Sequence, residues 1–103
     1  MHHHLVFFWL SDQLTDSERR CFEIELEALI KTPSVLTGYY GMPADTHRPV
    51  VDRSYSYGLT LNFSGIAEHD QYQIDPVHLA FVERNSNKWG KVLIYDIETS
   101  PKN

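Results

Sequence analysis

Close to its start the chain carries six apolar residues in a row, and few folds can accommodate such a run. Residues 5–10 read Leu-Val-Phe-Phe-Trp-Leu, with no turn residue among them. Aromatic and β-branched residues favour extended backbone, so we predict a β-strand from His4 to Leu10. Successive side chains point to opposite faces of a strand. One face therefore carries Val6, Phe8 and Leu10, and the other carries Leu5, Phe7 and Trp9. Both faces need to be covered.

An amphipathic helix is predicted after this strand. Thr15 followed by Glu18 forms a capping-box pattern, and apolar residues then recur at Phe22, Leu26, Leu29 and Ile30. The helix is expected to end near Thr32, because the following proline disfavours helical geometry in the residue before it.

Two strands and a long loop follow. We predict a strand over 35–40 and a loop over 42–53, which has two prolines and no periodicity. Residues 54–63 alternate completely, which predicts a half-buried strand. The larger side chains of that strand are Tyr55, Tyr57, Leu59, Leu61 and Phe63.

The last third of the chain predicts two short helices and a closing strand. Residues 66–74 favour a short helix, and Asp75-Pro76 then indicates an N-cap and the first position of another. A strand over 91–97 completes the domain, with a polar tail over about 99–103.

These elements give the order β-α-β-β-α-β, with the second helical region broken in two. That order is typical of a ferredoxin-like α+β fold with an antiparallel four-stranded sheet, and 103 residues suffice for a single domain, 1–103. Helices would cover one face of the sheet only. Because the first strand is apolar on both faces, we expect a second copy of the chain to cover the other face, as a homodimer.

Composition and charge narrow the classes of partner. The formal net charge is −5 at pH 7, and no basic stripe is present, which argues against nucleic acid and membrane surfaces as partners. Residues 5–10 are too few to cross a bilayer, so we expect a cytoplasmic protein. Cys21, the sole cysteine, falls on the apolar side of the predicted helix and is interpreted as a buried, inert thiol.

The chain's histidines are interpreted first as structural residues. His2, His3 and His4 run straight into the first strand, where neighbouring side chains point to opposite faces and no Cys or carboxylate cluster lies nearby to complete a site. We therefore expect no metal site and no cofactor. His47 and His69 are interpreted as solvated surface residues.

Three stretches resemble the stress-responsive A/B barrel (Dabb) family: residues 3–10, the helix after Thr15, and residues 72–82. The last is the most specific, because the family pattern there is a tyrosine, two variable residues, His-Pro-x-His and an apolar helix. This chain has Tyr72, Asp75 in place of the first histidine, and His78 as the second.

The resemblance implies a dimeric α+β barrel, whose members include a plant polyketide cyclase. In that cyclase the histidine matching His78 is the general base, and the tyrosine matching Tyr72 orients the reacting carbonyl. Its other pocket histidines match His4 and Tyr57. The residues themselves leave the charge state of His78 open. The positive end of a helix dipole disfavours imidazolium, whereas a nearby Asp75 carboxylate would favour it.

Two classes of function stay open. One is a homodimer that binds a small, partly apolar ligand between sheet and helices, with His4, Tyr55, Tyr57 and Asp75 as candidate ligand-binding residues. The other is a cofactor-free enzyme of cyclase, isomerase or lyase type, in which His78 is the general base and Tyr72 the hydrogen-bond donor. Cofactor-free monooxygenases share the architecture, but that is an analogy of fold only.

Overall fold

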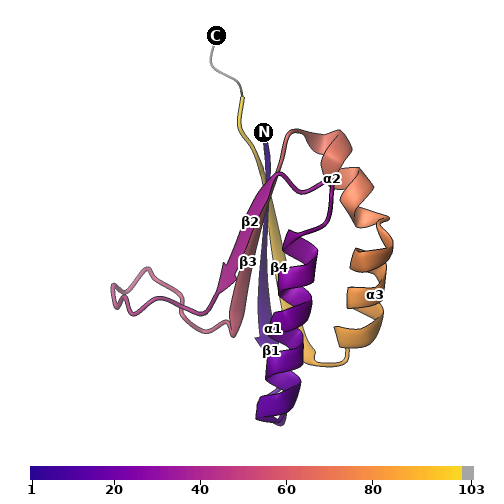
Figure 1. Ribbon diagram of the computed structural model, residues 1–103. Helices are drawn as coiled ribbons and strands as arrows, with labels where there is room; N and C mark the ends of the chain where they lie inside the picture. Colours follow the sequence, from indigo (N-terminus) through magenta and orange to yellow (C-terminus); the bar gives the residue numbers. More distant parts are fainter. Residues whose placement is uncertain (101–103) are drawn as a thin grey trace.

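The computed structural model describes residues 1–100 and confirms the ferredoxin-like α+β fold (Figure 1). The elements in chain order are β1 (His2–Leu10), α1 (Asp16–Ile30), β2 (Thr37–Gly41), β3 (Tyr57–Phe63), α2 (Ile66–Gln73), α3 (Pro76–Asn85) and β4 (Trp89–Glu98). Of the predicted polar tail, residues 101–103 lie outside the described part. Thr99 is paired with Met1 through backbone hydrogen bonds.

The four strands form one antiparallel sheet in the order β2-β3-β1-β4. β1 lies in the middle, with His4 opposite Leu61 of β3 and Asp96 of β4. All three helices lie on one side of the sheet, and the loop between β2 and β3 extends on the other side (Figure 1). No helix within residues 1–100 has both the length and the apolar character that crossing a membrane requires.

The core lies between the sheet and the helices. Its buried members from the sheet are Val6, Phe8, Tyr57, Leu59, Leu61 and Phe63, and those from the helices are Phe22, Leu26, Leu29, Tyr72 and Phe81. The alternation predicted for β1, and that predicted for β3 from Tyr57 to Phe63, are therefore confirmed, with the even-numbered side of β1 facing the helices. Phe8, Phe22 and Phe81 contact one another edge to face or tilted, with ring centroids 5.2 to 6.0 Å apart.

The caps predicted for the helices are present. The Thr15 hydroxyl accepts a hydrogen bond from the Glu18 backbone, and the Glu18 carboxylate accepts one from the Thr15 backbone. Asp75 caps α3 by accepting from the backbone N–H of Val77 at 2.8 Å. The prediction for Cys21 is wrong, because its side chain is exposed. Only Phe22, Leu26 and Leu29 of α1 are fully buried, so the buried stripe is narrower than the sequence pattern.

The sheet face away from the helices is apolar and open in the single chain. Leu5, Phe7 and Trp9 are half-buried on it, and β4 adds Tyr95 and Ile97, which are 55% and 49% exposed. Tyr55 also packs on this face, with its ring centroid 5.0 Å from that of Phe7. The expectation that Tyr55 shares a face with Tyr57 is wrong, because β3 begins at Tyr57 and regular alternation does not extend before it.

Candidate functional site

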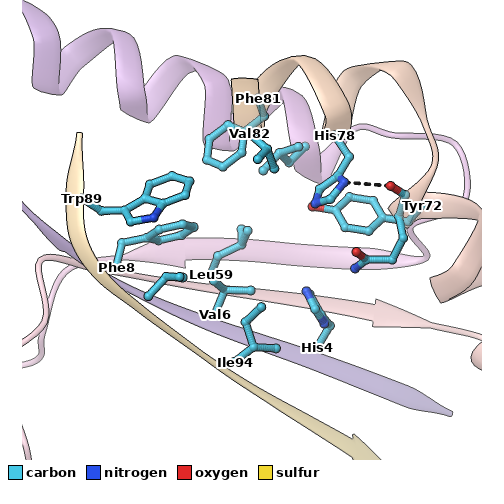
Figure 2. Close-up of a pocket in the computed structure, with 13 residues that line it drawn as sticks. His4, Val6, Phe8, Leu59, Tyr72, His78, Phe81, Val82, Trp89 and Ile94 are labelled. Atoms are coloured by element: carbon cyan, nitrogen blue, oxygen red, sulfur yellow. Dashed lines mark hydrogen bonds between the residues drawn. The ribbon is translucent and has the colours of Figure 1, made fainter. Parts of the chain in front are cut away.

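A cavity of about 270 Å³ lies between the sheet and helices α2 and α3. Its walls are mostly apolar, and its polar groups gather at one end, where His4, Tyr72 and His78 lie (Figure 2). Phe8 and Trp89 lie at the other end (Figure 2). The remaining lining residues are Val6, Leu29, Leu59, Gln73, Phe81, Val82, Val92 and Ile94.

The cavity has an exposed rim beside β4. Val82 and Val92 are each 39% exposed, and Ile94 is 49% exposed, although all three line the cavity. Val92 and Ile94 pair with Phe8 and Val6 of β1, so they lie on the helix-facing side of an edge strand that the helices leave partly uncovered. A small molecule could enter along this rim.

His78 is held by the junction between α2 and α3. Its Nδ1 lies 3.0 Å from the backbone carbonyl oxygen of Gln73. A carbonyl oxygen can only accept, so Nδ1 carries the proton and donates it to this bond. In the neutral imidazole Nε2 then holds a lone pair, which is the state that a general base or a hydrogen-bond acceptor needs.

Tyr72 lies beside His78, with the two ring centroids 4.7 Å apart (Figure 2). The side chain is 2% exposed. Burial, and secondarily the Asp75 carboxylate, raise the pKa of the Tyr72 phenol well above its usual range. The hydroxyl therefore stays protonated at neutral pH and can donate a hydrogen bond to a ligand.

His4 reaches the same cavity from the middle of the sheet. It is 3% exposed, and its Nδ1 lies 2.6 Å from Asp96 Oδ1 on the neighbouring strand. Burial lowers the pKa of His4, and the contact with Asp96 opposes this only in part. The polar end of the cavity thus combines residues from β1, α2 and α3.

Three of the candidate residues do not reach this cavity. Tyr57 packs beneath α1 beside Phe22, and its hydroxyl donates to Glu23 Oε2 at 2.5 Å. Tyr55 is on the opposite face of the sheet, as described above. Asp75 directs its carboxylate to the first turn of α3, so its role is to cap the helix that carries His78.

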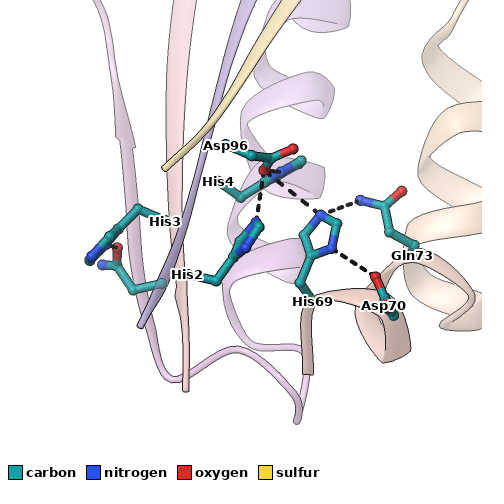
Figure 3. Close-up of polar contacts among 8 residues, drawn as sticks. His2, His3, His4, His69, Asp70, Gln73 and Asp96 are labelled. Carbon is teal, nitrogen blue, oxygen red and sulfur yellow. Dashed lines mark hydrogen bonds and ion pairs between the residues drawn. The ribbon is translucent and has the colours of Figure 1, made fainter. Parts of the chain in front are cut away.

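The structure also gathers a histidine cluster that the sequence interpretation missed. His2 and His4 share one face of β1 because they are two residues apart, while His3 points to the other face and contacts Asn62 (Figure 3). Asp96 and His69 complete the group. The expectation that no Cys or carboxylate cluster lies nearby to complete a site missed the single carboxylate of Asp96, which strand pairing places directly opposite His4.

His69 was expected on the surface, but its side chain is only 12% exposed. It packs against His2 and His4, with ring centroids 4.3 and 5.0 Å apart. Sequence alone gives one usable signal for this cluster, the spacing of His2 and His4. The positions of His69 and Asp96 depend on how α2 and β4 pack against β1.

A family model, the stress responsive A/B barrel domain, matches residues 3–99 of the chain. The protein therefore belongs to the stress-responsive A/B barrel (Dabb) family. No curated protein sequence matches the chain significantly.

Solved structures with the same fold span almost the whole chain. A Dabb family protein with a ferredoxin-like fold from Mesorhizobium loti is 24% identical, with a TM-score of 0.78 and 97% of both chains covered. The hydroxynitrile lyase of Passiflora edulis is 20% identical, with a TM-score of 0.78 and 97% of this chain and 96% of that one covered. A dimeric ferredoxin-like protein from Thermobifida fusca is 15% identical, with a TM-score of 0.77 and 95% and 90% covered. These likenesses concern the fold.

Proposed function

We propose that this protein is a homodimer that binds a small, partly apolar ligand in the cavity between its sheet and helices α2 and α3. The observation that carries the proposal is the cavity itself, with apolar walls and three polar side chains gathered at one end. Ligand sites are commonly built in this way, with apolar lining for affinity and a few polar groups for orientation. A volume of about 270 Å³ suits a ligand of modest size.

The polar end of the cavity indicates the chemistry of the ligand. The protonated Tyr72 hydroxyl is a donor, and His78 with its proton on Nδ1 presents Nε2 as an acceptor. A carbonyl oxygen suits Tyr72, and a proton on a neighbouring carbon or hydroxyl suits His78. Phe8, Leu59 and Trp89 provide apolar and aromatic surface. We therefore expect aromatic or aliphatic aldehydes and ketones to be the best ligand class.

The open face of the sheet supports the homodimer. Leu5, Phe7, Tyr95 and Ile97 form an apolar surface that no helix covers and that the Tyr55 ring covers only at Phe7. A second copy packed face to face would bury it around a twofold axis. The similar protein from Thermobifida fusca is described as dimeric.

Ligand binding is tested with 4-hydroxyacetophenone, a small aromatic ketone, and the fluorescence of Trp89. The chain's other tryptophan, Trp9, lies on the open face, so a Trp9→Phe background leaves Trp89 as the reporter. We expect saturable quenching that becomes at least about tenfold weaker in affinity when Val92→Phe fills the rim. Ile24→Phe is the matched control, on an exposed part of α1 remote from the cavity. Equal affinity in both variants would place the ligand elsewhere.

A second candidate function is cofactor-free acid–base catalysis at the same cavity. The observation that favours it is the hydrogen bond from His78 Nδ1 to Gln73, which leaves Nε2 as the basic nitrogen. In this scheme His78 removes a proton from the carbon next to a carbonyl, and Tyr72 donates to the enolate oxygen as charge develops there. Such chemistry belongs to cyclases, isomerases and lyases, and one protein of the same fold is a hydroxynitrile lyase.

A further inference from the structure

We propose that His2, His4, His69 and Asp96 form a binding site for a divalent transition-metal cation, with Zn²⁺ or Co²⁺ as its best occupants. The site adjoins the polar end of the ligand cavity, because His4 belongs to both, but it is built from a separate set of side chains. It goes beyond the ligand-binding function proposed above.

The ligand atoms are already close together. One ligand atom from each of the four residues lies within 4.8 Å of the others. Asp96 Oδ1 is the centre of the group, 2.9 Å from His2 Nε2, 2.6 Å from His4 Nδ1 and 3.8 Å from His69 Nε2 (Figure 3). Around a tetrahedral ion with bonds of about 2.0–2.2 Å, neighbouring ligand atoms lie roughly 3.3 Å apart. Small side-chain movements would therefore suffice.

The chemistry of the donor set selects the class of ion. Three imidazole nitrogens and one carboxylate suit Zn²⁺ and its neighbours, whereas Ca²⁺ and Mg²⁺ prefer oxygen ligands. His2 and His4 are 6% and 3% exposed, and only Asp96 has a substantial solvent-facing surface. Three nitrogen donors are thus held in a mostly buried, pre-arranged group, which lowers the conformational cost of binding a cation.

An outer carboxylate orients one of the histidines. His69 Nδ1 lies 3.2 Å from Asp70 Oδ1, so Nδ1 donates its proton to that carboxylate. Nε2 of His69 is then the nitrogen with a lone pair, and it is the nitrogen nearer to Asp96. A carboxylate that fixes the tautomer of a ligating histidine is a recurring part of metal sites. This second observation is independent of the clustering of the four ligands.

The alternative explanation is chelation by the three consecutive histidines at the start of the chain. The fold separates the two explanations, because His3 points away from His2 and His4 and contacts Asn62 at 2.6 Å (Figure 3). A built site needs His69 and Asp96 but not His3. A simple terminal chelate needs His3 as much as its neighbours and does not depend on His69.

The test uses the full chain without an affinity tag, stripped with a chelator and titrated with Co²⁺. We expect saturation at one ion per chain and the intense visible absorption of four-coordinate Co²⁺, which Zn²⁺ then displaces. His69→Gln and Asp96→Asn are expected to weaken binding at least about tenfold, and Asp70→Asn by roughly tenfold. His3→Gln is the matched control and is expected to bind like the wild type.

Folding of each variant is checked by far-ultraviolet circular dichroism. If His69→Gln does not fold, Asp70→Asn serves in its place, because the Asp70 side chain is 69% exposed. The proposal is overturned if Co²⁺ gives only weak octahedral absorption, or if His3→Gln loses as much affinity as His69→Gln. Binding of 4-hydroxyacetophenone to the metal-free protein is measured in parallel, so failure of the metal site and failure of the ligand cavity are distinguishable.

Discussion

The hydrogen bond from His78 to Gln73 decides which imidazole nitrogen faces a ligand. A glutamine at this position has no basic nitrogen, so His78→Gln is expected to slow deuterium exchange of the α-protons of 4-hydroxyacetophenone in D₂O at least about 100-fold. Exchange is followed by proton NMR. His47→Gln is the matched control, because His47 lies in the exposed loop between β2 and β3.

Two outcomes separate the candidate functions. Slow exchange in His78→Gln with ligand affinity retained would assign catalysis to His78. If the wild type shows no exchange above that of His78→Gln, while both proteins bind the ketone, the protein is a binding protein only.

Tyr57 provides a test of core electrostatics. Burial, and then the hydrogen bond to Glu23, raise the pKa of Tyr57 from 10.0 to about 12. Because the pKa is higher in the folded chain, the protonated Tyr57 phenol stabilises the fold fully below pH 10. This contribution to the free energy of unfolding is lost as the pH rises from 10 to about 12, since the unfolded chain ionises the phenol first. Between these limits the free energy of unfolding should fall more steeply with pH in the wild type than in Tyr57→Phe.

Urea unfolding at several pH values measures this difference. Absorbance of tyrosinate provides the direct check, since Tyr57→Phe removes one phenol that titrates late. Parallel pH dependence in the two proteins would show that the Tyr57 phenol is as accessible to ionisation in the folded chain as in the unfolded one.

At the scale of single residues the sequence predicted positions that local chemistry determines. The capping roles of Thr15 and Asp75 are such cases, and both are confirmed. His69 and Cys21 are the opposite cases, because burial of a helix side chain depends on which neighbour the helix packs against. The helical periodicity of the sequence shows which side of a helix is apolar, but not how many side chains of that helix its neighbours cover.

At the scale of elements, Gly38 sets how closely β2 approaches its neighbours. A Cβ atom there would lie 2.8 Å from Leu61 Cδ2 and 2.9 Å from the Thr60 carbonyl oxygen, with Ile30 of α1 also in contact. Gly38→Ala is therefore expected to lower the free energy of unfolding by about 1–3 kcal/mol. Gly41→Ala in the same strand is the control, because nothing lies within 4 Å of its Cβ position.

Chemical denaturation of both variants measures the effect. Equal stability of Gly38→Ala and Gly41→Ala would mean that β2 can shift to make room, and that its packing against α1 is loose.

The order of the elements was predictable because each has its own periodicity and boundary signals. The broken second helical region followed from Asp75-Pro76, and the structure has α2 and α3 on either side of that break. The ends of the strands were less predictable. β3 was expected from Ser54 but begins at Tyr57, and β4 begins at Trp89 rather than Lys91. Strand ends depend on the partner strand, which a local pattern does not contain.

At the scale of the whole molecule, the uncovered sheet face predicts the assembly. Tyr95 lies on that face opposite Leu5 and is 55% exposed in the single chain. In a face-to-face dimer Tyr95→Asp would bury one unpaired carboxylate from each chain. Self-association should therefore weaken at least about 100-fold. Sedimentation velocity at micromolar concentration is expected to show a dimer for the wild type and a monomer for this variant.

Ile24→Asp is the control, because Ile24 is exposed on the helix side of the molecule. It should leave the dimer intact. A wild-type monomer at these concentrations would contradict the proposed assembly.

The two-sided apolar character of β1 could be recognised in the sequence, so an open apolar face was predictable. The cavity was predictable only in part. His4, Tyr72 and His78 were identified from the family pattern, but Gln73, Trp89, Val92 and Ile94 line the same space because of the way α3 and β4 pack. A cavity forms where side chains from several elements leave space unfilled, so the sequence pattern of a single element does not predict it.

The most direct test of the ligand site is a crystal structure of the protein with 4-hydroxyacetophenone. We expect the aromatic ring in the cavity against Phe8 and Trp89, and the carbonyl oxygen within about 2.7–3.0 Å of the Tyr72 hydroxyl. The α-carbon should face His78 Nε2. Density for the ketone on the open sheet face, or a cavity closed by its own side chains at saturating ketone, would contradict the account.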